Sequence, residues 1–191
     1  MAYVTPGTVA AGDVATAAAW NVLTNDVIDN RAVLVNLKST SLTTSTTTTV
    51  TTAGTFYDIT GLSISITPTS ATSKIMIWGQ VSVGLDQNNI ITFRLVRDST
   101  AVGVGTSASL RQAASAGVYY GSAVMTSGAA QYPVPMQFLD SPATTSATTY
   151  KIQTGSNANG QVVYINRSFL DTDQNSQFRG VSTITVMEVP V

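Results

Sequence analysis

The chain has no cysteine and no histidine among its 191 residues. Without cysteine there is no disulfide framework and no thiolate chemistry. Without histidine the commonest general base and most zinc sites are missing. The carboxylate pairs that remain, Asp171 with Asp173 and Asp26 with Asp29, lie among polar residues where solvated carboxylates are ordinary. We therefore expect a protein that is not an enzyme and that uses no cofactor.

Charge is scarce as well, since 10% of the residues are charged and 43% are hydrophobic. Globular proteins typically carry about 25% charged residues. The net charge is −1 and the nine basic residues are scattered, so the sequence indicates no nucleic-acid partner and no anionic membrane. A chain with so little charge either buries surface between copies or aggregates. We expect a homo-oligomer.

Long apolar runs are also missing. Because no stretch approaches ~18 consecutive apolar residues, we expect no membrane insertion. The N-terminal stretch MAYVTPGTVAAGDV has no basic region ahead of an apolar one, which argues against a secretory signal and for synthesis in a cytoplasm. Asn166-Arg167-Ser168 matches the N-glycosylation sequon, but a chain made in a cytoplasm would not encounter the glycosylation enzymes.

What the chain does contain is an alternation of apolar and polar residues with a period of two, which places one face of a strand on a core. Between Phe56 and Arg97 the expected inward residues are Leu62, Ile64, Ile66, Ile75, Ile77, Val81, Val83, Ile91, Phe93 and Leu95. Further strands are expected at 101–104, 118–125, 134–139, 148–154, 162–165 and 182–189, the last with Ile184, Val186 and Glu188 on one face. About eight to ten strands at this spacing predict a mainly β chain with an antiparallel jelly-roll β-sandwich.

Two local signals refine this prediction. Pro133 and Pro135 interrupt the strand at 134–139, and since proline cannot donate to a ladder, this strand is expected at an edge or a bulge. Asn159-Gly160 is the strongest short hairpin signal in the chain.

Residues 1–40 are predicted to be an attachment segment that contains a short helix. Asp13 fits an N-cap ahead of the helix-forming stretch Val14 to Ala19. The apolar residues that follow keep a heptad spacing, so three copies brought together could form a brief bundle. These residues are Trp20, Leu23, Val27, Leu34 and Leu37. The alternatives are one amphipathic helix packed on its own domain, or a helix that ends near Asn30.

Residues 41–54 fall within a threonine-rich run, STSLTTSTTTTVTT for 39–52. Threonine branches at Cβ and disfavours a helix, so this segment is expected to be an extended connector or a first strand. Residues 55–191 then form the β domain.

Three loops are candidates for ligand contact, near 86–89, 106–116 and 171–177. Their polar candidates are Asp86, Asn88, Asn89, Asp171, Asp173 and Asn175. The run Asp171 to Asn175 resembles the start of a calcium loop, but Ser176 stands where the turn glycine should be and Ser182 replaces the terminal glutamate. We therefore predict no metal site. Five aromatic residues could form a sugar-binding shelf, although such residues in β proteins are more often structural. They are Tyr119, Tyr120, Tyr132, Tyr164 and Phe178.

Several segments of the sequence resemble those of small virion proteins of tailed bacteriophages, of the tail-fibre or appendage type. Those proteins end in a trimeric jelly-roll head like that of the tumour-necrosis-factor group. The segments are AGDVATAAAWNVLTNDVIDN, DITGLSISITPTSATSKIMI, FRLVRDST, FLDSPATTSATTYKIQTGS, VYINRS and RGVSTITVMEV. The resemblance implies a homotrimer with the strand Ser182 to Val189 near the threefold axis, and Ile184 and Val186 among its contacts. It also implies that residues 1–38 bind other virion proteins.

Three functions are consistent with these observations. The first is a non-enzymatic virion appendage, a tail fibre or a tail-associated protein that contacts the host surface, with a surface glycan as a candidate ligand. The second is a capsid decoration or cement protein, which fits because no shaft repeats occur between Thr40 and Gly54. The third and more remote is a carbohydrate-binding or carbohydrate-acting module.

Overall fold

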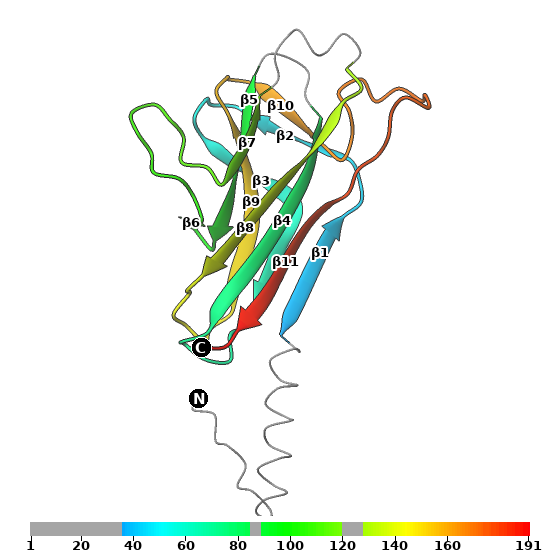
Figure 1. Cartoon of the computed structure of the whole chain (residues 1–191). Coiled ribbons are helices and arrows are strands. Elements are labelled where there is room, and N and C mark those ends of the chain that lie inside the picture. The colour runs from blue at the N-terminus through cyan, green and yellow to red at the C-terminus, as the bar shows by residue number, and fades with distance from the viewer. Residues whose placement is uncertain (1–35, 85–88, 120–127) are drawn as a thin grey trace, which may run out of the picture.

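The computed structural model describes residues 36–84, 89–119 and 128–191, in which every regular element is a β-strand. Two antiparallel sheets pack face to face as a β-sandwich (Figure 1). The predicted helix and the heptad residues Trp20, Leu23, Val27 and Leu34 lie outside the described residues. Among the described residues, no helix has the length and apolar character needed to cross a membrane.

The first sheet is built around one long central strand. It contains β1 (Leu37–Leu42), β2 (Thr46–Val50), β4 (Lys74–Gly84), β8 (Gln131–Asp140), β10 (Gln161–Ile165) and β11 (Ser182–Val189). Strand β4 pairs with β8 along one edge, and its other edge is shared by β11 and β10 in succession. Strand β1 lies beyond β11 and β2 lies beyond β10.

The second sheet repeats this arrangement on a smaller scale. It contains β3 (Phe56–Ile66), β5 (Ile90–Arg97), β6 (Thr100–Val102), β7 (Ala116–Tyr119) and β9 (Thr148–Ser156). Strand β9 lies between β3 and β5, and the far edge of β5 is shared by β7 and β6. The β3–β9 pairing shifts register between Asp58 and Ser63, where Gly61 has a φ of +89°.

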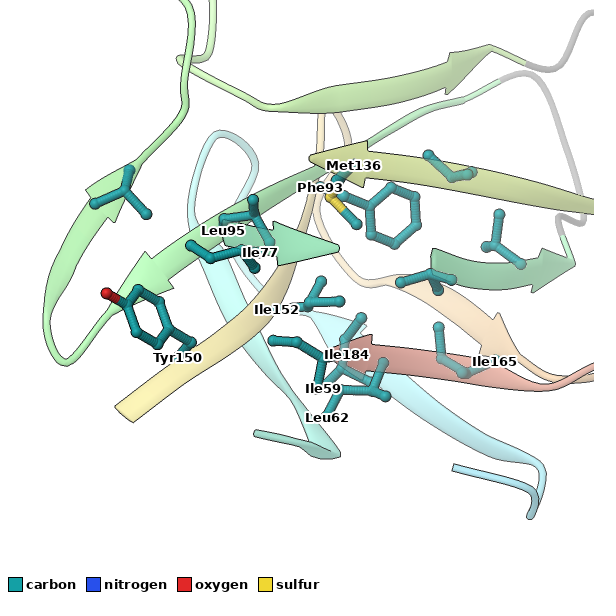
Figure 2. Close-up of a cluster of buried hydrophobic side chains, with 14 of the residues drawn as sticks. Ile59, Leu62, Ile77, Phe93, Leu95, Met136, Tyr150, Ile152, Ile165 and Ile184 are labelled. Atoms are coloured by element: carbon teal, nitrogen blue, oxygen red, sulfur yellow. The ribbon is translucent and has the colours of Figure 1, made fainter. Parts of the chain in front are cut away.

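The core lies between the two sheets and uses the residues that the period of two predicts. Phe93 and Ile152 from one sheet meet Ile77 and Ile184 from the other, and each of the four is fully buried (Figure 2). Burying an aliphatic or aromatic side chain of this size contributes about 1.5–3 kcal/mol. The predicted inward residues of β3, β4, β5 and β11 are confirmed, with Ile64 partly buried at the margin of the core.

Strand β8 lies at a sheet edge, as its prolines predict. Within the described residues it pairs only with β4, and Pro133 and Pro135 are exposed. Prolines on an edge remove donors that another chain could use, which protects the edge from uncontrolled pairing.

The threonine-rich run belongs to the sandwich. Strands β1 and β2 take up 37–50 and pair with β11 and β10. Of the two interpretations of the sequence, a connector or a first strand, the structure shows strands, because cross-strand pairing incorporates this segment into the first sheet.

A buried asparagine ties the two ends of the first sheet together. Asn166 is fully buried and adopts a left-handed φ of +61°. Its Nδ2 donates to the carbonyl oxygens of Leu42 (2.6 Å) and Thr44 (3.0 Å), and its Oδ1 accepts from Ser182 Oγ (2.7 Å). The asparagine of the apparent glycosylation site is thus a structural residue with its amide occupied inside the fold.

Candidate functional site

Twelve outward residues of the first sheet form a patch without an ionisable side chain, which we call the uncharged face, and Lys74 of β4, which pairs with Val189 of β11 in the next row, lies at its margin. The uncharged face consists of outward residues of four neighbouring strands, as the pairing register places them. They are Leu37, Ser39 and Ser41 of β1; Thr183, Thr185 and Met187 of β11; Met76, Trp78 and Gln80 of β4; and Pro135, Gln137 and Leu139 of β8. Their inward neighbours on β4, β8 and β11, such as Ile77, Met136 and Ile184, belong to the core.

These twelve residues form three rows across the sheet. The first row is apolar throughout, because Leu37, Met187, Met76 and Leu139 lie side by side. Trp78 lies in the middle of the second row. In the same row the hydroxyl groups of Ser39 and Thr185 form a hydrogen bond of 2.8 Å. Four strands and three rows span about 14 Å in each direction.

Large apolar side chains on this face are open to solvent. Trp78 is 37% exposed, Leu139 41% and Leu37 52%. Beside Trp78 the surface is hollowed by about 550 Å³ between β4, β8 and β11. Contiguous exposed apolar surface of this kind is typical of an interaction site.

The outward side of the second sheet is different, because it carries paired charges. Lys151 Nζ lies 2.8 Å from Asp58 Oδ2, and Gln153 Nε2 donates to Asp58 Oδ1 at 2.6 Å. The Arg94 guanidinium lies 4.1 Å from the centroid of the Phe56 ring. Burying these charged groups would carry a desolvation cost that the uncharged face does not have.

The structure therefore distinguishes the two sides of one sandwich by their chemistry. The uncharged face can be covered by protein with Lys74 only at its margin, and the other side of the sandwich is suited to solvent. Interface centres are depleted of charge in the same way. The arrangement points to assembly through the first sheet.

The predicted assembly residues divide between this face and the core. Leu37 lies on the uncharged face, at the start of its apolar row. Ile184 and Val186 are fully buried between the two sheets of one chain. Their predicted role as contacts between copies is corrected, since a side chain with no exposed area offers none to a neighbour. The outward residues of the same strand, Thr183, Thr185 and Met187, are the ones available.

The predicted ligand loop at 171–177 is closed by its own ion pairs. The Asp171 carboxylate contacts Arg167 Nη1 through Oδ2 and Arg179 Nη2 through Oδ1, both at 2.9 Å. Both oxygens are therefore occupied, while Asp173 and Asn175 are exposed. The described residues contain no cluster of three or more acidic side chains that could hold a metal ion.

The loop at 86–89 is described only at its last residue. Asn89 donates through Nδ2 to Gln161 Oε1, which fastens it to β10. Asp86 and Asn88 lie outside the described residues.

The Glu188 carboxylate, for which the sequence pattern predicted no function, anchors residue 36, where the described residues begin. Glu188 Oε1 accepts from the backbone N–H (2.8 Å) and hydroxyl (2.7 Å) of Thr69, and Oε2 accepts from Asn36 Nδ2. Burial opposes ionisation of Glu188, but hydrogen bonds from Ser73, Thr69 and Asn36 outweigh it and lower its pKa to about 2. Residue 36 is thereby held to the core-facing side of β11.

Comparisons with known proteins assign no family. No family model and no curated protein matches the chain. Similar solved structures include those of the infectious bursal disease virus Gt strain (13% identity, TM-score 0.39) and Gx strain (14%, 0.36). A third is the VP2 subviral particle of the same virus (9%, 0.37). The matches cover 82%, 79% and 80% of this chain but only 39%, 37% and 37% of those chains. This chain thus spans less than half of their length, and the likeness is too remote to assign a function.

Proposed function

We propose that this chain is a non-enzymatic structural protein of a tailed-bacteriophage virion, assembled in the host cytoplasm as a homotrimeric β appendage. Its N-terminal segment fixes it to other virion proteins, and its jelly-roll head projects as a tail fibre or a tail-associated protein that contacts the host. The observation that carries this proposal is the uncharged face. The sequence resemblance supplies the virion context.

Three copies of the head bury their uncharged faces against one another around a common axis. Trp78 and the apolar row that begins at Leu37 are exposed in the single subunit. Removing such side chains from water stabilises an assembly by about 25 cal/mol for each Å² buried. Because none of the twelve residues is ionisable, covering them desolvates no charge of their own, and Lys74 lies at the margin of the face.

The attachment segment leaves the head beside this same face. Residue 36 immediately precedes β1, and Leu37 is the first residue of the apolar row. Three attachment segments would therefore start close to the axis of the trimer. The hydrogen bonds of Glu188 to Asn36 and Thr69 anchor this exit point to the head.

A mass measurement in dilute solution tests the assembly. Sedimentation of the purified chain should give about 60 kDa, three times the 19.9 kDa subunit. A compact 19.9 kDa particle at micromolar concentration would contradict it.

A truncation tests the attachment role. Deleting residues 1–35 keeps Asn36 and the whole of β1, so the head should fold with an unchanged melting temperature while incorporation into particles is lost. A truncated protein that still enters particles at the native level would show that the anchor lies elsewhere.

Capsid decoration is the second candidate, and one observation favours it. Strands β1 and β2 take up residues 37–50 within the sandwich, which leaves no room for a shaft between the attachment segment and the head. Particles that lack a decoration protein should burst more easily and still adsorb to the host. Particles that lack a receptor-contacting protein should be as robust as the native ones and fail to adsorb.

A further inference from the structure

A second surface feature lies at the other end of the sandwich from the attachment point. The turn before β3, the start of β5, the loop between β6 and β7 and the turn after β9 enclose a groove of about 570 Å³. It is lined by Gly54, Ile90, Thr92, Leu110, Arg111, Gln112 and Asn157, together with Ala53. Strand β3 runs from this end to the end near Thr69 and Glu188 (Figure 1), and its 11 residues span about 30 Å.

The floor and one wall of this groove are held in place by specific hydrogen bonds. Gln112 Oε1 accepts a hydrogen bond from the Thr92 hydroxyl, and Gln112 Nε2 donates to the Ser156 carbonyl oxygen at 2.9 Å. Ser115 donates its backbone N–H to the Phe93 carbonyl at 2.8 Å, and its Oγ accepts from Leu95 N–H at 3.1 Å. The loop from β6 to β7 is thus fastened to β5 at two places, so the groove is formed before any ligand arrives.

Apolar side chains stand open around the groove. Leu110, at the tip of the loop, is 97% exposed, and Ile90 is 42% exposed. Tyr119 pairs directly with Ile90 across β5 and β7, and it is 65% exposed. An aromatic ring beside aliphatic groups suits the C–H face of a sugar ring, with the Tyr119 hydroxyl as a polar handle.

Arg111 supplies the charge of the groove. The other described arginines have partners: Arg97 binds Asp140, Arg167 and Arg179 bind Asp171, and Arg94 donates to Gln153 while lying over Phe56. Arg111 is exposed, and among residues 36–84, 89–119 and 128–191 no anion pairs with its guanidinium. A planar guanidinium without an internal partner is well suited to bind a carboxylate in a bidentate manner.

Neutral polar groups complete the lining. Asn157 is exposed and uses Oδ1 to accept from Ile90 N–H at 2.9 Å, which orients its NH₂ group. The rest of the polar lining is hydroxyl and amide, with no acidic residue. An acidic ligand therefore meets no repulsion there, and its hydroxyl groups find neutral partners.

We propose that this groove binds an acidic saccharide, a sugar that bears a carboxylate. Arg111 binds the carboxylate, Leu110, Ile90 and Tyr119 contact the apolar face of the ring, and Asn157 donates to a hydroxyl group. The volume of about 570 Å³ is in the range of small-ligand sites, which is roughly 300–1,000 Å³. The groove is formed within one subunit, so this proposal does not depend on the threefold assembly, which would only add avidity.

The test is binding of the full chain to an array of uronate- and sialate-bearing oligosaccharides beside their neutral counterparts of the same skeleton. At least one carboxylated member should bind, with its neutral counterpart at least tenfold weaker. Arg111→Gln should weaken that binding by about ten- to a hundredfold, because it removes a charge-assisted pair. Leu110→Ser should weaken it as well, with the melting temperature unchanged since the side chain is exposed.

Arg179→Gln is the matched control, because it removes another exposed guanidinium from a different loop. It should bind like the native chain. The proposal is overturned if no carboxylated member binds better than its neutral counterpart, if Arg111→Gln binds as tightly as the native chain, or if Arg179→Gln is weakened equally. Equal binding of a poly-glutamate peptide would also overturn it, since the groove would then recognise charge alone. Failure here with a 60 kDa mass in solution would leave the proposed assembly standing.

Discussion

Replacing Thr185 by lysine is the sharpest test of the uncharged face, because the second sheet offers a matched position. Thr185 is on β11 between β1 and β4, and its hydroxyl meets Ser39 Oγ at 2.8 Å. Thr149 is on β9 between β3 and β5, and its hydroxyl meets Ser65 Oγ at 2.7 Å. Both threonines point outward and are half-buried. Thr185→Lys and Thr149→Lys thus make the same change on opposite sides of one sandwich.

In a single subunit both variants should fold normally. Each new ammonium group extends into water, so the free energy of unfolding should change by no more than about 0.5 kcal/mol. In the trimer the lysine at 185 is covered by surfaces that hold no carboxylate. Burying a charge without a partner costs about 3 kcal/mol or more per copy, which weakens each contact by about a hundredfold. The lysine at 149 stays in solvent.

The measurement is sedimentation velocity at micromolar concentration, with thermal unfolding alongside. The native chain and Thr149→Lys should sediment near 60 kDa, three times the 19.9 kDa chain, and Thr185→Lys should sediment as a single subunit. If Thr185→Lys remains trimeric while folded, the copies do not meet through the uncharged face. If both variants dissociate, the effect is general destabilisation and the assignment to one sheet is wrong.

Two further changes test the fold itself. The pKa of Glu188 is about 2 in the folded chain, against an ordinary value of 4.5, so its stabilisation of about 3 kcal/mol is present above pH 4.5 and should be lost as the pH falls towards 2. In Glu188→Gln this loss should disappear from the pH dependence of chemical denaturation. If the variant loses stability at acid pH as the native chain does, another group is responsible. A methyl group on Gly180 would stand 2.1 Å from Ser82 Oγ, whereas one on Gly105 would have its nearest contact at 3.9 Å. Gly180→Ala should therefore lower the free energy of unfolding by about 1–3 kcal/mol and Gly105→Ala should leave it nearly unchanged, and equal denaturation midpoints for the two would refute the close approach.

The faces of the strands were predictable because a period of two is a local property. Leu62, Phe93 and Ile184 alternate with polar neighbours, and all three are buried. The edge position of β8 was also predictable, since Pro133 and Pro135 cannot donate to a neighbouring strand.

The candidate sites could be predicted only in part. The sequence singled out Asp171 as a ligand-loop residue, but its carboxylate is taken by Arg179, which approaches from the segment leading into β11. It singled out the loop at 106–116, yet the groove also needs Gly54 and Asn157 from two other turns. Which distant residues meet a side chain depends on the packing of the sheets, and no local pattern encodes it.

The amino-acid sequence by itself determined that the described chain forms strands, which side of each strand is apolar, and that the surface is poor in charge. The tertiary structure decided which strands are neighbours, and therefore on which face of the sandwich the charged side chains lie. Register places twelve outward residues of β1, β4, β8 and β11 side by side with no ionisable group among them and Lys74 in the next row, although β1 and β11 are separated by most of the chain. Tertiary structure also decided that Ile184 faces the core of its own subunit, because alternation shows that a side chain is covered but not which chain covers it.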